Sequence, residues 1–121
     1  MSPSIKVTYF DTAGRGELTR LALTVGGVVF EDERPDWAAF GVMKPTLPLG
    51  QLPVVTVDGT TYAQSMAIAR YAGRVAGLYP TEPLDALKVD TVLESLVELA
   101  NGMVDIIWFT KDEEAKAEKT K

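Results

Sequence analysis

The chain has 121 residues, of which 12 are basic and 17 are acidic, and it contains neither cysteine nor histidine. Without these two residue types there is no imidazole base, no His- or Cys-ligated metal, no disulfide and no CxxC redox pair. The net charge of −5, the absence of a long apolar stretch and the lack of a signal-peptide pattern argue against nucleic acid, a membrane span and secretion, so we expect a cytoplasmic protein that binds no metal.

The negative charge is confined to one part of the chain. Residues 1–80 hold seven basic and seven acidic side chains, whereas residues 81–121 hold five basic and ten acidic ones, which accounts for the whole −5. This step in composition predicts a boundary near Pro80 to Pro83. We therefore expect one domain over residues 1–80 and the start of another over residues 81–121.

The first third of the chain predicts a strand, a helix and a second strand. Residues 5–10 (IKVTYF) alternate and are rich in β-forming residues. After a turn, Leu18, Leu21, Ala22 and Val25 follow helical spacing, and the pair Gly26-Gly27 is typical of a helix end. Residues 28–33 predict the second strand, and residues 35–44 a connection with one or two helical turns.

Two β-runs joined by Asp58-Gly59 form the strongest local pattern. Residues 52–57 (LPVVTV) and 60–64 (TTYAQ) flank a dipeptide that is typical of a type I′ hairpin turn, so these strands should be antiparallel. A helix over residues 65–76 follows, with Ser65 as its expected N-cap.

A long amphipathic helix is expected from residue 84 or 85, fraying after Lys111. Its acidic residues Asp90, Glu94 and Glu98 stand four apart without basic partners at the same spacing. They form either a solvated face or a cation-binding one.

The order of these elements is a βαβ unit followed by a ββα unit. This order predicts an α/β fold with a thioredoxin-like, mixed, four-stranded sheet. The long helix then begins an all-α domain, which the chain leaves incomplete.

Three segments resemble the cytosolic glutathione transferases, and within them the sigma class, which includes prostaglandin D synthases and S-crystallins. They are Thr8-Tyr9-Phe10-Asp11 with Gly14-Arg15-Gly16-Glu17 and Arg20, the run from Lys44 to Val54 (KPTLPLGQLPV), and the run from Gln64 to Tyr71 (QSMAIARY). That family's second domain has several helices, of which this chain holds about one. The resemblance therefore implies a truncated second domain.

The resemblance also implies a role for particular residues. Tyr9 would hydrogen-bond the sulfur of glutathione and Arg15 would be the nearby cation that helps to keep it as thiolate. The remaining glutathione-binding residues would be Trp37, Lys44, Leu52, Pro53, Gln64, Ser65 and, across a homodimer, Glu98. The pocket for a hydrophobic electrophile would include Phe10, Met103 and Val104.

Each of these roles has a plainer alternative. Tyr9 could be an ordinary strand aromatic, Arg15 a solvated charge, Pro53 a trans proline and Ser65 only a cap. Phe10, Met103 and Val104 could be core residues. The sequence Gly14-Arg15-Gly16 also invites a dinucleotide-binding interpretation, but the pattern needs a small residue where Thr19 stands.

The sequence therefore predicts a glutathione transferase, an enzyme in which glutathione is co-substrate or recycled cofactor in detoxification or in a prostaglandin-type isomerisation. The alternative is a non-catalytic glutathione-binding or structural protein of the S-crystallin kind. The absence of cysteine fits either, because glutathione supplies the thiol.

Overall fold

The computed structural model describes residues 3–120, with side chains described over residues 3–102. Strands and helices follow one another in the expected order within that range. They are β1 (Ile5–Thr8), α1 (Glu17–Val25), β2 (Glu31–Glu33), α2 (Trp37–Met43), the 3₁₀ turn η1 (Lys44–Thr46), β3 (Val54–Val57), β4 (Thr60–Tyr62), α3 (Ser65–Val75) and α4 (Pro83–Thr120). None of the described helices combines the length and apolar character that crossing a membrane requires.

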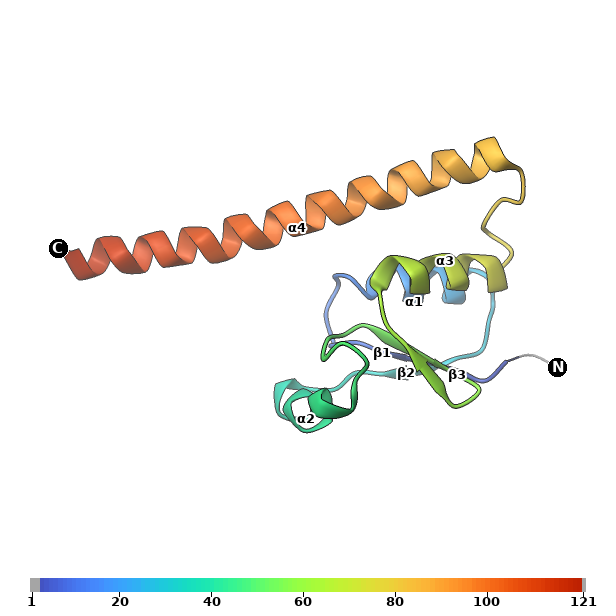
Figure 1. Ribbon diagram of the computed structural model, residues 1–121, viewed down its shortest axis with the longest axis horizontal. Helices are drawn as coiled ribbons and strands as arrows, with labels where there is room; N and C mark the ends of the chain where they lie inside the picture. The colour runs from blue at the N-terminus through green and yellow to red at the C-terminus, as the bar shows by residue number, and fades with distance from the viewer. Residues whose placement is uncertain (1–2, 121) are drawn as a thin grey trace.

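The four strands form one mixed sheet in the order β2-β1-β3-β4. β1 is parallel to β2 and antiparallel to β3, and β3 is antiparallel to β4. Helices α1 and α3 lie side by side over one face of the sheet, while α2 lies on the other side (Figure 1). The expected thioredoxin-like βαβ-ββα arrangement is thus confirmed.

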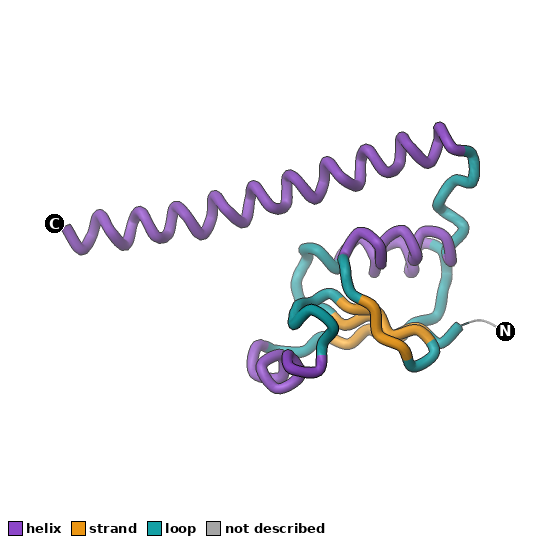
Figure 2. Tube along the Cα trace, viewed as in Figure 1, coloured by secondary structure: helices purple, strands orange, loops and turns teal. Residues whose placement is uncertain are grey.

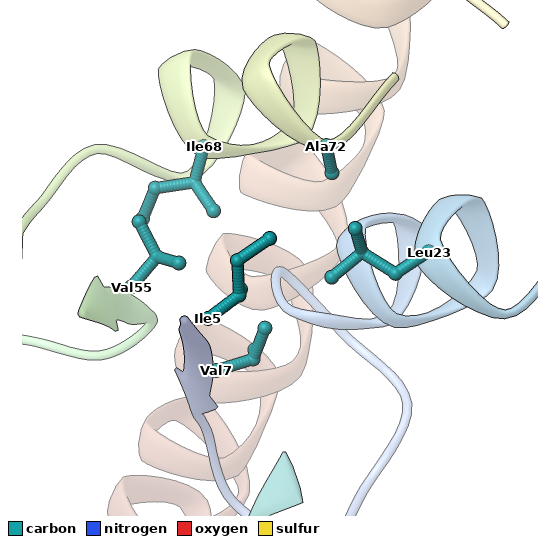
Figure 3. Close-up of a cluster of buried hydrophobic side chains, with 6 residues drawn as sticks. All are labelled: Ile5, Val7, Leu23, Val55, Ile68 and Ala72. Atoms are coloured by element: carbon teal, nitrogen blue, oxygen red, sulfur yellow. The ribbon is translucent and has the colours of Figure 1, made fainter. Parts of the chain in front are cut away.

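The hydrophobic core lies between the sheet and the pair α1 and α3 (Figure 3). Ile5 and Val7 point to the same face of β1 because alternate residues of a strand share a face. They meet Val55, Leu23, Ile68 and Ala72. Each large aliphatic side chain buried in this way contributes about 1.5–3 kcal/mol, so this cluster holds in place the strands whose ends carry the site residues.

Local turn chemistry agrees with the sequence. Asp58 and Gly59 have φ angles of 48° and 87°, both positive as a type I′ turn requires. Helix α1 ends with Gly27 at a φ of 68°, and the N–H of Val28 donates to the carbonyl of Leu23, which completes a Schellman motif. The hairpin and the glycine stop are confirmed.

The strands are shorter than predicted, for a physical reason at each end. β1 ends at Thr8 because the carbonyl of Phe10 accepts from the N–H of Thr12 and from the Arg20 side chain instead of from a neighbouring strand. β2 begins only at Glu31 because Val28 is still engaged in closing α1.

Helix α1 turns a different face to the sheet from the one its apolar spacing indicated. Leu21 and Val25 are 51% and 71% exposed, whereas Leu23 and Thr19 are almost fully buried against the sheet. The expected stripe instead borders an apolar hollow of 270 Å³ between α1, α3 and α4.

Helix α4 is one continuous rod that extends well past α1 and α3 (Figure 2). It begins at Pro83, where the carboxylate of Glu82 accepts from the N–H groups of Leu84 (3.0 Å) and Asp85 (2.8 Å). These backbone hydrogen bonds lower the pKa of Glu82. The helix extends to Thr120 in this structure, and the expected fraying after Lys111 stays a prediction.

Candidate functional site

The register of the strands gathers three of the expected site residues at one end of the sheet. β1 and β3 are antiparallel with Thr8 opposite Val54, so Tyr9 and Pro53, the next residues outward, lie at the same end. β4 is antiparallel to β3 and also ends there, two residues before Gln64. Loop residues far apart in the sequence therefore share one edge of the fold.

The side chain of Tyr9 is held by the loop that follows β1. Its hydroxyl accepts a hydrogen bond of 3.2 Å from the backbone N–H of Arg15. Gly14 and Gly16 lie so close that a Cβ on Gly16 would be 2.5 Å from Tyr9 Cγ. A phenol accepts two hydrogen bonds and donates one, so the contact with Arg15 leaves the Tyr9 proton available. The accepted bond also polarises the O–H group, which makes it a better donor to an anion.

A buried arginine fixes the turn that carries Tyr9. Arg20 is 4% exposed and donates to the carbonyls of Tyr9 (2.6 Å) and Phe10 (2.9 Å), and its Nε pairs with Asp32 at 2.7 Å. Its guanidinium carbon also lies 5.5 Å from the centre of the Tyr9 ring. Sequence reasoning assigned no role to Arg20, and its place in the motif that follows Tyr9 was the only signal that pointed to it.

A second arginine closes this ion network at the surface. Arg34 pairs with Asp11 at 2.7 Å and with Asp32 at 2.9 Å. The hydrogen bond that Arg34 donates to Asp11, and next the one that it donates to Asp32, raise the pKa of Arg34. The loop after β1 and the end of β2 are thereby linked on the side where α2 begins.

Helix α2 is attached to the site by aromatic rings. The ring of Phe10 lies 5.5 Å from that of Trp37 and 5.2 Å from that of Phe40. Trp37 is 75% exposed, and the ring next to Lys44 belongs to Phe40, with Nζ 5.8 Å from its centre. Phe10 thus packs among these rings, and Phe40 joins the candidate site although the sequence did not single it out.

Helix α3 presents free N–H groups at the same end of the sheet. Ser65 is the first residue of the helix and not its N-cap, which corrects the sequence interpretation. The N-cap is Gln64, whose φ of 82° turns the chain so that the helix starts one residue early, and no side chain caps it. The first intrahelical bond back to Gln64 comes from Ile68, so the N–H groups of Ser65, Met66 and Ala67 precede it and stay unpaired within the helix. Such a terminus attracts anions.

The segment before β3 lies next to Tyr9. The Leu52-Pro53 peptide bond is cis, the state that the resemblance implied for Pro53. Leu52 is outside the strand, and among the described residues its N–H has no hydrogen-bond partner. Its backbone is therefore open to an extended ligand.

Helix α4 closes one side of this region. A cavity of 280 Å³ is bordered by Arg15 and Ser65 from the first part of the chain and by Leu96 and Ala100 from α4. The guanidinium of Arg15 donates to the side-chain oxygen of Asn101 on α4. Asn101 is a contact that sequence reasoning missed, since nothing local to residue 101 indicates it.

Of the stripe formed by Asp90, Glu94 and Glu98 on α4, the first two bind a cation from α3. Arg70 pairs with Asp90 at 3.0 Å and with Glu94 at 2.5 Å, and the Tyr79 hydroxyl contacts both oxygens of Asp90 at 2.8 and 2.9 Å. The hydrogen bonds from Tyr79 first and from Arg70 next lower the pKa of Asp90, and the same contact raises that of Tyr79. For Asp90 and Glu94, the interpretation as a solvated face is wrong, because the partner is on another helix.

The remaining expected residues on α4 are Glu98, Met103 and Val104. Glu98 is exposed and makes no ion pair with a residue whose side chain is described. The side chains of Met103 and Val104 lie outside the described residues.

The comparisons with known proteins agree with this geometry. Residues 5–74 match the family model "Glutathione S-transferase, N-terminal domain". Glutathione S-transferase 1 of Ascaris suum is 46% identical over 95 residues, which cover 76% of this chain and 45% of that protein. S-crystallin SL11 of Nototodarus sloanii is 36% identical over 120 residues, or 98% of this chain and 58% of that protein.

Solved structures give the same result. The structure of prostaglandin synthase D of Nilaparvata lugens superposes with a TM-score of 0.82 at 38% identity and covers 97% of this chain and 58% of that one. The chain thus spans about half the length of the relatives it matches. On the match of residues 5–74 and on these relatives, the chain belongs to the glutathione S-transferase family.

Proposed function

We propose that the chain binds glutathione in an extended form along the end of the sheet and holds its sulfur as a thiolate beside Tyr9. The observation that carries the proposal is the Tyr9 hydroxyl, which accepts from the Arg15 N–H at 3.2 Å and keeps its own proton free to donate. It stands at the sheet end where Leu52 and the start of α3 also offer unpaired backbone groups.

The proposed anchors match the γ-glutamyl, cysteinyl and glycine parts of glutathione. The γ-glutamyl carboxylate is bound by the first-turn N–H groups of α3 at Ser65, with the Gln64 side chain beside them. The backbone of Leu52, before Pro53, pairs with the cysteinyl unit as a further strand would. Lys44 binds the glycine carboxylate, and the rings of Phe40 and Trp37 border this end.

The proposed site activates the thiol by stabilising the negative charge of the thiolate sulfur. A free thiol has a pKa of about 8.5, and the thiolate is the nucleophile. A hydrogen bond to a charged group is worth about 1.5–3 kcal/mol, so the Tyr9 hydroxyl alone raises the thiolate fraction at neutral pH about tenfold or more. The Arg15 cation adds to this effect.

The thiolate then attacks a hydrophobic electrophile. In a displacement the sulfur forms a bond to carbon while the leaving group departs with its electron pair; in an isomerisation glutathione is released again. We propose Phe10, Met103 and Val104 as residues near that electrophile, and Glu98 as a contact to glutathione in the neighbouring subunit of a homodimer. Residues 1–80 then form the glutathione-binding domain and residues 81–121 the start of an α-helical one.

A second candidate function is glutathione binding or a structural role without turnover. The similarity to S-crystallin SL11 over 98% of this chain favours it, because that similarity is as extensive as the similarity to the synthase structure. The residues that would activate glutathione are present in this chain, which favours the enzyme.

Turnover of glutathione with a simple aryl halide distinguishes the two functions. We expect the chain to form the conjugate and Tyr9→Phe to bind glutathione with similar affinity while losing most of the turnover. Glutathione binding without turnover in the wild type would contradict the enzyme and support the binding protein. Absence of glutathione binding would contradict the enzyme and the glutathione-binding protein, and would leave the structural role.

A further inference from the structure

The contact between Arg15 and Asn101 links the site loop to helix α4. We propose that Asn101 is a positioning residue, which holds the Arg15 guanidinium beside the sulfur site through a neutral acceptor and leaves its positive charge available to the thiolate. This inference rests on the proposed function and adds a residue of α4 to it.

Arg15 contacts two different parts of the molecule, the side chain of Tyr9 and helix α4. Its backbone N–H donates to the hydroxyl of Tyr9 at 3.2 Å, while its side chain donates to the amide oxygen of Asn101. The side chain is exposed, and a free arginine side chain loses rotamer entropy when it is fixed. A hydrogen bond to a rigid helix therefore removes part of that cost before a ligand arrives.

Arg15 differs from three of the other four arginines of the chain; Arg74 shares with Arg15 the lack of an ion pair among the described side chains and lies over the ring of Tyr79. Arg20, Arg34 and Arg70 each form an ion pair with at least one carboxylate. The residues with described side chains offer Arg15 no carboxylate within ion-pair distance, and its hydrogen-bonded side-chain partner among them is an amide. Among the described side chains, its charge is thus oriented by an amide and is not neutralised by a carboxylate.

The surroundings of Arg15 strengthen this distinction. Over residues 3–102, the cavity of 280 Å³ that Arg15 borders is lined otherwise by Gly14, by Ser65 and by apolar side chains of α1, α3 and α4, and Arg15 is the one charged residue among them. Next to apolar walls a net charge acts over a longer distance than it does in water. A carboxylate at position 101 would form an ion pair with Arg15 and cancel most of this field.

Asn101→Asp separates positioning from simple docking of α4. The aspartate keeps an acceptor oxygen in the same place, so docking of the helix is preserved, but it neutralises the cation. If Asn101 served only to attach α4, this variant would behave like the wild type or be more stable, and the bound thiol would be unaffected.

The experiment is a pH titration of glutathione bound to the chain, followed by the ultraviolet absorbance of the thiolate. We expect Asn101→Asp to reduce the thiolate fraction at neutral pH about tenfold, the effect of removing one nearby opposite charge, without a lower unfolding temperature. Asn101→Ala should reduce it about threefold, because the cation is freed but not neutralised.

Two controls make the result specific. Thr91→Asp adds the same charge to the exposed side of α4, ten residues or about 15 Å away, beyond the range of screened charges, and should leave the thiolate fraction unchanged. In an Arg15→Ala background, Asn101→Asp should have no further effect.

A wild-type titration for Asn101→Asp would overturn the inference while leaving the proposed function intact. An equal effect of Thr91→Asp, or a full effect of Asn101→Asp in the absence of Arg15, would also overturn it. Failure of the wild-type chain to bind glutathione would overturn the proposed function, and the inference with it.

Discussion

The packing of Gly16 against the ring of Tyr9 gives a sharp test of how the candidate site is built. A Cβ at position 16 would lie 2.5 Å from Tyr9 Cγ and 2.7 Å from both Cβ and Cδ2. The backbone of Gly16 has φ and ψ of −95° and −11°, which alanine adopts without strain. The only cost of Gly16→Ala is therefore the collision with Tyr9, which moves the ring by about 1 Å.

The magnitude follows from two opposing terms. Overpacking costs about 1–3 kcal/mol, and the smaller conformational freedom of alanine in the unfolded chain returns about 0.4–1 kcal/mol. We expect a net loss of between about 0 and 2.6 kcal/mol in the free energy of unfolding. A displacement of about 1 Å in a catalytic group lowers turnover about 100-fold, so the effect on turnover should far exceed the effect on stability.

Urea unfolding and turnover of glutathione with an aryl halide measure the two effects. Gly41→Ala is the matched control, because Gly41 lies within α2 and an added Cβ there meets nothing within 4 Å. It should raise stability by up to about 1 kcal/mol and leave turnover unchanged. A Gly16→Ala variant with the stability and turnover of the wild type would refute the packing of Tyr9 described above.

Three further substitutions test the supports of the site. Arg20→Met removes the side-chain donor to the carbonyl of Tyr9 and one of the two arginines that bind Asp32. We expect a loss of about 2–4 kcal/mol in urea unfolding, and wild-type stability would contradict the role of the buried guanidinium. The pKa of Asp90 is lowered in the folded chain, so its contribution to stability is present above the ordinary aspartate pKa and is lost as the pH falls through the folded-state value. Asp90→Asn should therefore lower the unfolding temperature at neutral pH and make that temperature fall less steeply with acid. An equally steep fall in acid would argue against this ion network. Leu23→Ala should lower the free energy of unfolding by about 2–5 kcal/mol, because Leu23 is 1% exposed in the core. A loss below about 1 kcal/mol would contradict the position of Leu23 in the core.

Features that depend on neighbouring residues could be predicted from the sequence. The hairpin at Asp58-Gly59 and the helix stop at Gly27 follow from backbone conformations that few residue types adopt, so the residue names alone indicate them. The order of the elements then sufficed for the fold, because few arrangements accommodate a βαβ and a ββα unit on one sheet.

Features that depend on a partner elsewhere in the chain could not be predicted. The acidic residues Asp90 and Glu94 looked unpartnered because Arg70 lies on another helix. The spacing of apolar residues in α1 did not indicate its buried face, because that face includes Arg20. The Arg20 side chain is buried because it donates to carbonyls of the turn after β1, and these contacts cannot be seen from helical spacing. Ser65 was taken for a cap because the positive φ of Gln64 is unusual for that residue type.

The central claim is that the Tyr9 hydroxyl holds glutathione as a thiolate. The most direct measurement is the thiolate absorbance of bound glutathione against pH in the wild type and in Tyr9→Phe, at saturating glutathione. We predict that the wild type forms thiolate at neutral pH. In Tyr9→Phe the thiolate fraction should be at least about tenfold lower, as expected for the loss of a hydrogen bond to a charged group, with little change in the affinity for glutathione. Equal thiolate in both proteins would contradict the claim and assign activation of the thiol to another group.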